Sequence, residues 1–69
     1  MDIPTFREIV ADLERRGFER IRCKGSHAKY GRGGRTVIVC CKRMGGHPRK
    51  DTYKLMCKRL GFEPGKDGK

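Results

Sequence analysis

The sequence predicts a small α+β domain whose elements follow the order α-β-β-β-α. Apolar residues recur with helical spacing near each end of the chain, and three short runs with strand character lie between these two segments. Glycine-containing breaks separate the three runs and favour antiparallel hairpins. We therefore expect a three-stranded antiparallel sheet with both helices packed on one face, a two-layer arrangement that buries every apolar stripe.

A chain of 69 residues is one domain, which we assign to residues 1–62. A domain near this size buries only about 60% of the surface that its unfolded chain exposes, so a large substrate cavity is not expected. We expect residues 63–69, which carry no net charge, to form a disordered tail. No apolar run is long enough for a membrane span or a signal peptide, so we expect a cytoplasmic protein without membrane partners.

The first helix is expected from Thr5 to Arg16. Thr5 and Glu8 have the spacing of a capping box. The apolar residues of this segment fall at positions i, i+3, i+4 and i+7 of one face: Phe6, Ile9, Val10 and Leu13. Gly17 suits the left-handed position that ends a helix.

Two strands should follow the first helix. In residues 18–24, Ile21 and Cys23 alternate with basic side chains, which predicts one apolar and one basic face. Gly25-Ser26 interrupts this run, and residues 27–30 form a second short strand. We expect one face of the sheet to be free and basic, carrying Arg20, Arg22, Lys24, His27 and Lys29.

The third strand, residues 36–41, is apolar on both faces for most of its length, so we place it centrally or at least well covered. A turn rich in glycine and arginine, residues 31–35, precedes it. A basic loop over residues 42–50 contains His47, and the second helix begins at Asp51 or Thr52. Its apolar face comprises Tyr53, Met56, Cys57 and Leu60.

The expected core combines the apolar faces of all five elements. The residues that we expect to be largely buried are Phe6, Ile9, Val10, Leu13, Phe18, Ile21, Ala28, Val37, Val39, Met56 and Leu60. Tyr30 and Tyr53 could stack on nucleic-acid bases, but each lies on an apolar stripe, which favours core packing.

The net charge of +10 is unevenly distributed. Residues 1–17 have a net charge of −1, whereas residues 18–62 have a net charge of +11. A field concentrated on part of a folded domain indicates a polyanionic partner, either nucleic acid or an acidic protein, in preference to general solubility.

The four cysteines do not predict a metal site or a disulfide framework. Cys40 and Cys41 are adjacent and would point to opposite faces of a strand, and no other pair has the spacing of zinc ligands. Without a secretory signal, disulfides are not expected. We therefore interpret all four as small buried thiols of a reduced protein.

His27 is the candidate for chemistry on the basic face. Cleavage of RNA without a metal ion requires a base for the 2′-hydroxyl proton and an acid for the leaving 5′ oxygen, and histidine suits either task. Lys24, Lys29 and Arg22 are close in sequence, and we expect Arg35 to approach across the hairpin. The residues alone leave open whether His27 is catalytic or is only an exposed strand histidine.

The segment Arg22-Cys23-Lys24-Gly25-Ser26-His27-Ala28-Lys29-Tyr30 resembles the Arg-x-x-Gly-Ser-His-x-x-aromatic signature of the HicA toxins. The resemblance extends from about Phe6 to Phe62. His27 matches the signature position for position, whereas His47 follows the third strand later than the family pattern has it, so we interpret His47 as a loop residue.

The resemblance implies a fold like that of double-stranded-RNA-binding domains and a small ribonuclease that cleaves mRNA. It also implies toxicity to the producing cell and neutralisation by an acidic antitoxin of the HicB type. We therefore predict a metal-independent endoribonuclease toxin of a type II toxin–antitoxin system, with His27 as general acid or base and no cofactor. Its RNA-binding residues are predicted to be Arg22, Lys24, Gly25, Ser26, Lys29 and Arg35.

Two alternatives belong to other functional classes. One is an RNA-binding module without catalysis, which holds RNA through lysine and arginine alone. The other is a basic protein that binds an acidic partner protein through the same face. Binding to nucleic acid should weaken steeply with salt, whereas a protein partner should give a stoichiometric complex that resists nuclease treatment.

Overall fold

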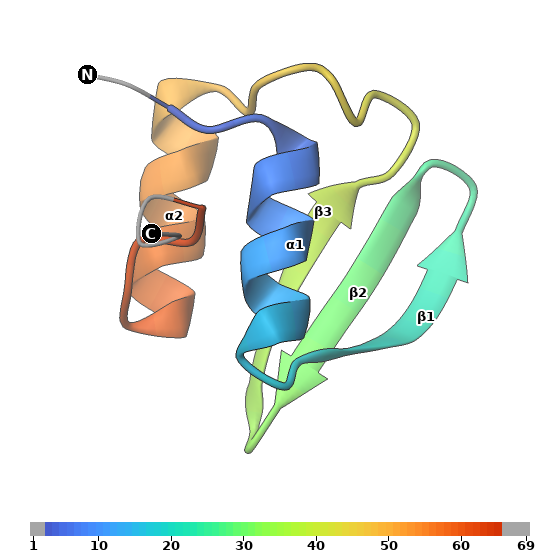
Figure 1. The fold of residues 1–69 in the computed structure, drawn as a ribbon, viewed down its shortest axis with the longest axis vertical. Coiled ribbons are helices and arrows are strands. Elements are labelled where there is room, and N and C mark those ends of the chain that lie inside the picture. Colours follow the sequence, from blue (N-terminus) through green and yellow to red (C-terminus); the bar gives the residue numbers. More distant parts are fainter. Residues whose placement is uncertain (1–2, 66–69) are drawn as a thin grey trace.

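The computed structural model describes residues 3–65 and has the predicted α-β-β-β-α order (Figure 1). The sheet is antiparallel throughout, and its strand order β1-β2-β3 follows the chain. The predicted α+β fold is therefore confirmed. The bounds of its elements are α1 Phe6–Arg15, β1 Glu19–Lys24, β2 His27–Arg32, β3 Arg35–Cys40 and α2 Lys50–Leu60.

Helix α1 begins with the capping box that the sequence predicts. The Thr5 backbone N–H donates to Glu8 Oε1 at 2.7 Å, and the Glu8 backbone N–H donates to Thr5 Oγ1 at 3.2 Å. These two bonds satisfy donors that have no partner within the helix. Gly17 follows the helix with φ +92°, a left-handed conformation that favours glycine.

Strand β2, and not β3, lies at the centre of the sheet, so the predicted central position of residues 36–41 is wrong. Short hairpins join β1 to β2 and β2 to β3, and this connectivity leaves the third strand at an edge. Val37 and Val39 are buried, but Ile38 on the other face is 47% exposed. The apolar character of the outer face of β3 is therefore not explained by burial in the sheet.

Strand β1 contains an irregularity that overturns two predictions. Arg20 lies opposite Tyr30 and Arg22 lies opposite Lys29, so Ile21 is an extra residue in a β-bulge. Ile21 is 60% exposed and not part of the core. Arg20 lies opposite a buried tyrosine, which puts it on the helix side of the ladder and not on the free face.

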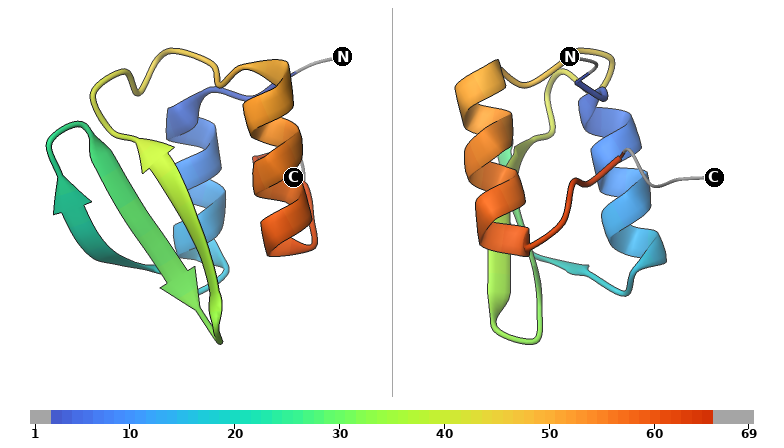
Figure 2. Two further views of the ribbon diagram at one scale, coloured as in Figure 1. Left: turned by 180° about the vertical axis from the view of Figure 1, so that it is seen from behind. Right: turned by 90° about the vertical axis from the view of Figure 1, so that its left-hand side faces the viewer.

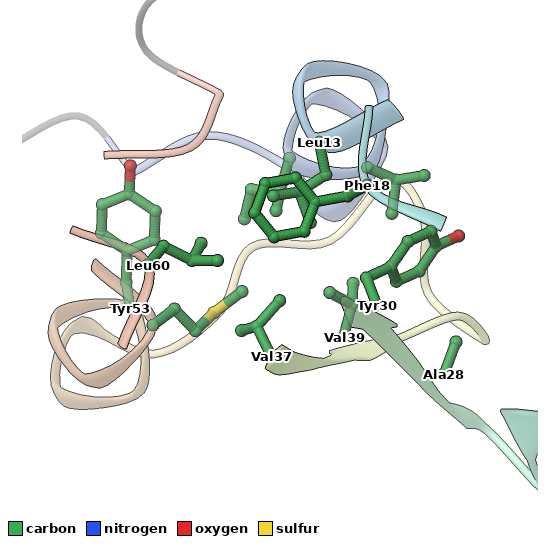
Figure 3. Close-up of a cluster of buried hydrophobic side chains, with 11 residues drawn as sticks. Leu13, Phe18, Ala28, Tyr30, Val37, Val39, Tyr53 and Leu60 are labelled. Carbon is green, nitrogen blue, oxygen red and sulfur yellow. The ribbon is translucent and has the colours of Figure 1, made fainter. Parts of the chain in front are cut away.

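The core lies between the two helices and one face of the sheet (Figures 2 and 3). Except for Ile21 and for Phe6, which is only half-buried, every residue predicted to be largely buried is part of it. Tyr30 and Tyr53 also belong to the core, which confirms that packing is preferred over base stacking. The buried apolar residues are Ile9, Val10, Leu13, Phe18, Ala28, Tyr30, Val37, Val39, Tyr53, Met56 and Leu60.

Residues 63–65 are packed against the domain, although the sequence predicts that the tail begins here. Pro64 is buried, and its carbonyl accepts a hydrogen bond of 2.7 Å from the Tyr53 hydroxyl. Gly65 lies so close to Pro4 that a Cβ added at Gly65 would be 2.8 Å from the Pro4 Cβ. The remainder of the predicted tail, residues 66–69, lies outside the described residues.

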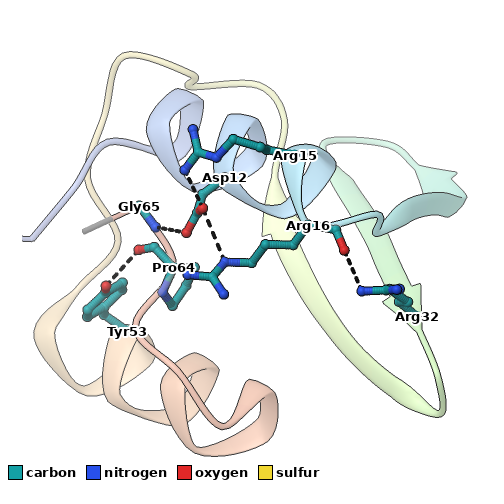
Figure 4. A network of polar contacts seen from close by, with 7 residues as sticks. All are labelled: Asp12, Arg15, Arg16, Arg32, Tyr53, Pro64 and Gly65. Carbon is teal, nitrogen blue, oxygen red and sulfur yellow. Dashed lines mark hydrogen bonds and ion pairs between the residues drawn. The ribbon is translucent and has the colours of Figure 1, made fainter. Parts of the chain in front are cut away.

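A buried carboxylate joins this C-terminal segment to α1 (Figure 4). Asp12 is 1% exposed and accepts a hydrogen bond of 2.8 Å from the Gly65 backbone N–H. Its other oxygen accepts from Arg15 Nη2 at 2.6 Å and from Arg16 Nε at 3.2 Å. Three donors thus surround a single buried charge, as burial of a charge requires.

Candidate functional site

The site begins at the two-residue turn between β1 and β2. Gly25 has φ +60°, and a Cβ added there would meet nothing within 4 Å. The glycine is therefore explained by the backbone conformation and not by crowding within the chain. This turn leaves open space above Gly25, so an external molecule can approach the backbone closely.

His27 is the first residue of β2 and is exposed. It lies opposite Lys24 in β1 and opposite Cys40 in β3, so these three side chains share one face of the sheet. Its Nδ1 is 3.5 Å from Ser26 Oγ, the upper limit of a hydrogen bond. The imidazole is therefore accessible and only weakly held by its neighbour.

Arg22 and Lys29 lie opposite each other farther along the same face, together with Ile38 of β3. Side chains two residues apart on a strand point to the same side, so Lys29 shares the face of His27. We call the surface formed by Arg22, Lys24, His27 and Lys29 the open face. Neither α1 nor α2 covers it, as the view from behind in Figure 2 shows. The structure thus brings together four of the predicted site residues.

Arg35 is not part of this group, contrary to the expectation that it approaches His27 across the hairpin. It lies opposite Arg32 at the far end of the β2–β3 ladder. Five strand positions separate Arg32 from His27, a distance of about 17 Å along β2 at the usual rise per residue. Arg35 Nη1 donates instead to the Leu60 carbonyl at 2.5 Å.

His47 has a contact that fits its interpretation as a loop residue. Its Nδ1 lies 2.6 Å from the Ile3 carbonyl oxygen, which can only accept, so the imidazole donates. This bond ties the loop after β3 to the segment before α1. The hydrogen bonds from Thr5 lower the pKa of Glu8, and the electrostatic interaction with nearby His47 adds a smaller effect in the same direction.

The cysteines differ from the prediction of four small buried thiols. Cys23 is exposed, and Cys40, Cys41 and Cys57 are half-buried. The Sγ atoms of Cys23 and Cys41 lie 3.8 Å apart, and each is 3.9 Å from the Gly25 carbonyl. Sequence spacing could not reveal this pair, because it depends on how β3 leaves the sheet.

Desolvation and the neighbouring Cys23 thiol raise the pKa of Cys41. Among residues 3–65, no cluster of three or more histidine, cysteine, aspartate or glutamate side chains could hold a metal ion. No helix among the same residues is long and apolar enough to cross a membrane.

Comparison with known proteins identifies the family. The model of the HicA toxin family, described as the HicA toxin of bacterial toxin–antitoxin pairs, matches residues 6–63. No curated protein and no solved structure gives a match. The matched segment contains both helices, the whole sheet and the Gly-Ser-His turn. The chain therefore belongs to the HicA toxin family.

Proposed function

We propose that this protein is an endoribonuclease toxin that cleaves mRNA without a metal ion and uses His27 as its general acid or base. The observation that carries the proposal is an exposed imidazole beside a glycine turn, on a sheet face that three cationic side chains share. Membership of a toxin family whose members are generally ribonucleases supports the same activity.

The proposed chemistry is an internal transfer at phosphorus. Neutral His27 accepts the proton of a ribose 2′-hydroxyl, and the resulting oxyanion attacks the adjacent phosphorus. The bond from phosphorus to the 5′ oxygen breaks, and this oxygen takes up a proton from solvent water, which leaves a 2′,3′-cyclic phosphate and a free 5′-hydroxyl, while protonated His27 returns its proton to solvent. Lys24, Lys29 and Arg22 stabilise the additional negative charge on the phosphoryl oxygens.

The open face also has features of a surface that a protein partner covers. Ile21 and Ile38 expose apolar groups beside the cations of the open face. Ile21 lies against Gly31, since a Cβ added at Gly31 would overlap the Ile21 Cδ1 atom. Apolar side chains surrounded by charge are typical of protein interfaces. We propose that an acidic antitoxin of the HicB type binds here and blocks access of RNA to His27.

A binding module without catalysis is the second candidate. The observation that favours it is the weak positioning of His27, whose ring lies 3.5 Å from Ser26 Oγ. A general base is usually oriented by a stronger bond to a second group. Lysine and arginine on the open face would hold RNA equally well in either case.

Cleavage of single-stranded RNA by the purified protein in excess EDTA distinguishes the candidates. We expect the parent protein to cleave and His27→Ala to cleave about 10²–10⁴-fold more slowly, the usual effect of losing a general acid or base. His47→Ala is the matched control and should lose little activity, because its ring bonds a backbone carbonyl.

Three outcomes would contradict the proposal. Absence of cleavage together with RNA binding would favour the binding module. A His27→Ala protein that cleaves at the parent rate would remove His27 from the mechanism. Cleavage that stops in EDTA and returns with magnesium would indicate a metal-dependent reaction.

A further inference from the structure

A second cationic site lies at the end of the sheet remote from His27. A cleft of about 650 Å³ opens there between the β2–β3 hairpin and the C-terminal ends of both helices. We call it the hairpin-end cleft. Its main lining residues are Arg16, Phe18, Arg32, Arg35, Gly61 and Phe62.

Two arginines of the hairpin are held in fixed positions in this cleft. Arg32 Nη1 donates to the Arg16 carbonyl at 2.6 Å, as Figure 4 shows, and Arg35 Nη1 donates to the Leu60 carbonyl. Each carbonyl belongs to the C-terminal end of a helix, where carbonyl groups lack partners within the helix and favour a cation.

Glycines provide the space for both side chains. A Cβ on Gly17 would lie 3.1 Å from Arg32 Nε, and a Cβ on Gly61 would overlap Arg35 Nη1. Each guanidinium has five N–H groups, and the bond to a helix carbonyl uses only one. Within residues 3–65, the ion pairs of Asp12 involve Arg15 and Arg16, and neither Arg32 nor Arg35 has a carboxylate partner there. Both cations are therefore positioned and not neutralised.

The lining of the cleft is also partly aromatic. The Arg16 guanidinium lies over the Phe62 ring at 4.0 Å from its centre, and the Phe18 ring meets Phe62 edge-on at 6.1 Å. Asp12 accepts a hydrogen bond from Arg16 Nε, which helps to orient this guanidinium. A planar guanidinium stacked on an aromatic ring is a surface on which a nucleobase can also stack.

We propose that the hairpin-end cleft binds a nucleotide unit, with Arg32 and Arg35 as ligands of the phosphate and the Arg16–Phe62 stack as the support of the base. An arginine side chain can form two parallel hydrogen bonds to one anion, and phosphate and carboxylate are the common anions that fit this geometry best. The ligand has two possible sources, a free nucleotide or a remote segment of the same RNA chain. The second source rests on the proposed function, whereas the first does not.

The test uses the wild-type protein and a single-stranded oligodeoxyribonucleotide, which has no 2′-hydroxyl and so cannot be cleaved by the proposed reaction. Backbone amide shifts are followed by NMR during titration with this oligonucleotide and, separately, with adenosine monophosphate. We expect the amides of residues 32–35 and 61–62 to shift and saturate. If these shifts saturate at similar concentrations of adenosine monophosphate and of the oligonucleotide, the ligand is a free nucleotide. If the oligonucleotide binds tenfold or more tightly, the ligand is the nucleic-acid chain.

Substitution tests the role of the arginines. Arg32→Gln combined with Arg35→Gln should weaken oligonucleotide binding by tenfold or more. Lys54→Gln combined with Lys58→Gln removes the same charge from exposed positions of α2 and should weaken it much less. Equal losses in the two variants, or no shift of residues 32–35 and 61–62 in the wild-type protein, would overturn the proposal and leave the arginines as helix caps.

The titration of the wild-type protein decides the question even if the arginine variant unfolds. It is also independent of cleavage. If the protein binds the oligonucleotide in the cleft but leaves RNA intact, the proposed nuclease activity is disproved and the proposed site in the hairpin-end cleft is still supported.

Discussion

At the scale of single residues, Asp12 is the buried charge on which the C-terminal segment depends. Burial raises the pKa of its carboxyl group, but the hydrogen bond from Gly65 and the contacts with Arg16 and Arg15 outweigh this effect. The net result is a pKa below the usual value of 3.8. Since the folded form binds the proton less readily than the unfolded form, ionised Asp12 stabilises the fold above this pH.

Asp12→Asn should therefore destabilise the protein in a way that depends on pH. We expect a loss of about 2 kcal/mol near neutral pH, the usual size for hydrogen bonds to a charged group. The difference should shrink as the pH falls below 3.8, because Asp12 of the unfolded chain then takes up a proton, whereas the folded form keeps its charge until its lower pKa is reached. Urea unfolding of both proteins at several pH values measures this difference. A difference that stays constant through the acid range would contradict the assignment.

Charge on the open face should control RNA binding more than the same charge elsewhere. Lys24→Glu combined with Lys29→Glu should weaken binding and reduce the slope of log affinity against log salt by about 0.7 for each phosphate that the variant no longer neutralises. Lys54→Glu combined with Lys58→Glu is the matched control on α2. Arg15 and Arg16 are unsuitable controls because both bond Asp12. Equal changes in the two variants would mean that only net charge matters.

At the scale of elements, β1 shows why the alternation of apolar and basic residues gave a wrong prediction for one side chain. The pattern of Ile21 and Cys23 predicted that both face the helices. The bulge between Arg20 and Arg22 interrupts the regular alternation of side chains between the two faces of the strand. Cys23 therefore lies opposite buried Ala28, as predicted, whereas Ile21 does not reach the core. Bulges depend on pairing with another strand, and no local pattern in β1 indicates one.

Two isoleucines allow a matched test of this assignment. Ile9 is fully buried, whereas Ile21 is 60% exposed. Ile9→Ala should cost about 2–5 kcal/mol of unfolding free energy, the usual range for emptying a core position. Ile21→Ala should cost about 0.5 kcal/mol, as is usual at the surface. Chemical denaturation of both variants measures these costs, and comparable losses would restore Ile21 to the core.

The candidate site was predictable where local rules sufficed. Gly25 and Ser26 form a turn, and His27 begins the next strand. The two-residue period of a strand correctly predicted that His27 and Lys29 lie on the same face. Arg35 was misplaced because its position depends on the length of the β2–β3 ladder and on the C-terminal end of α2. Contacts between distant segments, such as Cys23 with Cys41, leave no periodic signal.

At the scale of the whole molecule, the order of elements and the single covered face were predictable because each apolar stripe needs a partner. The edge position of β3 was not, since its sequence is apolar on both faces while α2 covers only one. The packing of residues 63–65 was also missed. The segment consists of one charged residue, a proline and a glycine, which have no apolar periodicity, and only the fold brings it to Tyr53 and Asp12.

The proximity of Pro4 and Gly65 closes the described chain almost into a ring. A short linker across this point should therefore permit a circular permutant whose new ends lie at Gly33 and Gly34, an exposed turn. Such a rearranged chain would retain the Gly25-Ser26 turn with His27 and would separate Arg32 from Arg35 in sequence. We expect this permutant to melt cooperatively, to keep the activity of the open face and to lose nucleotide binding in the hairpin-end cleft. This result would show that the two ends of the sheet act independently of each other.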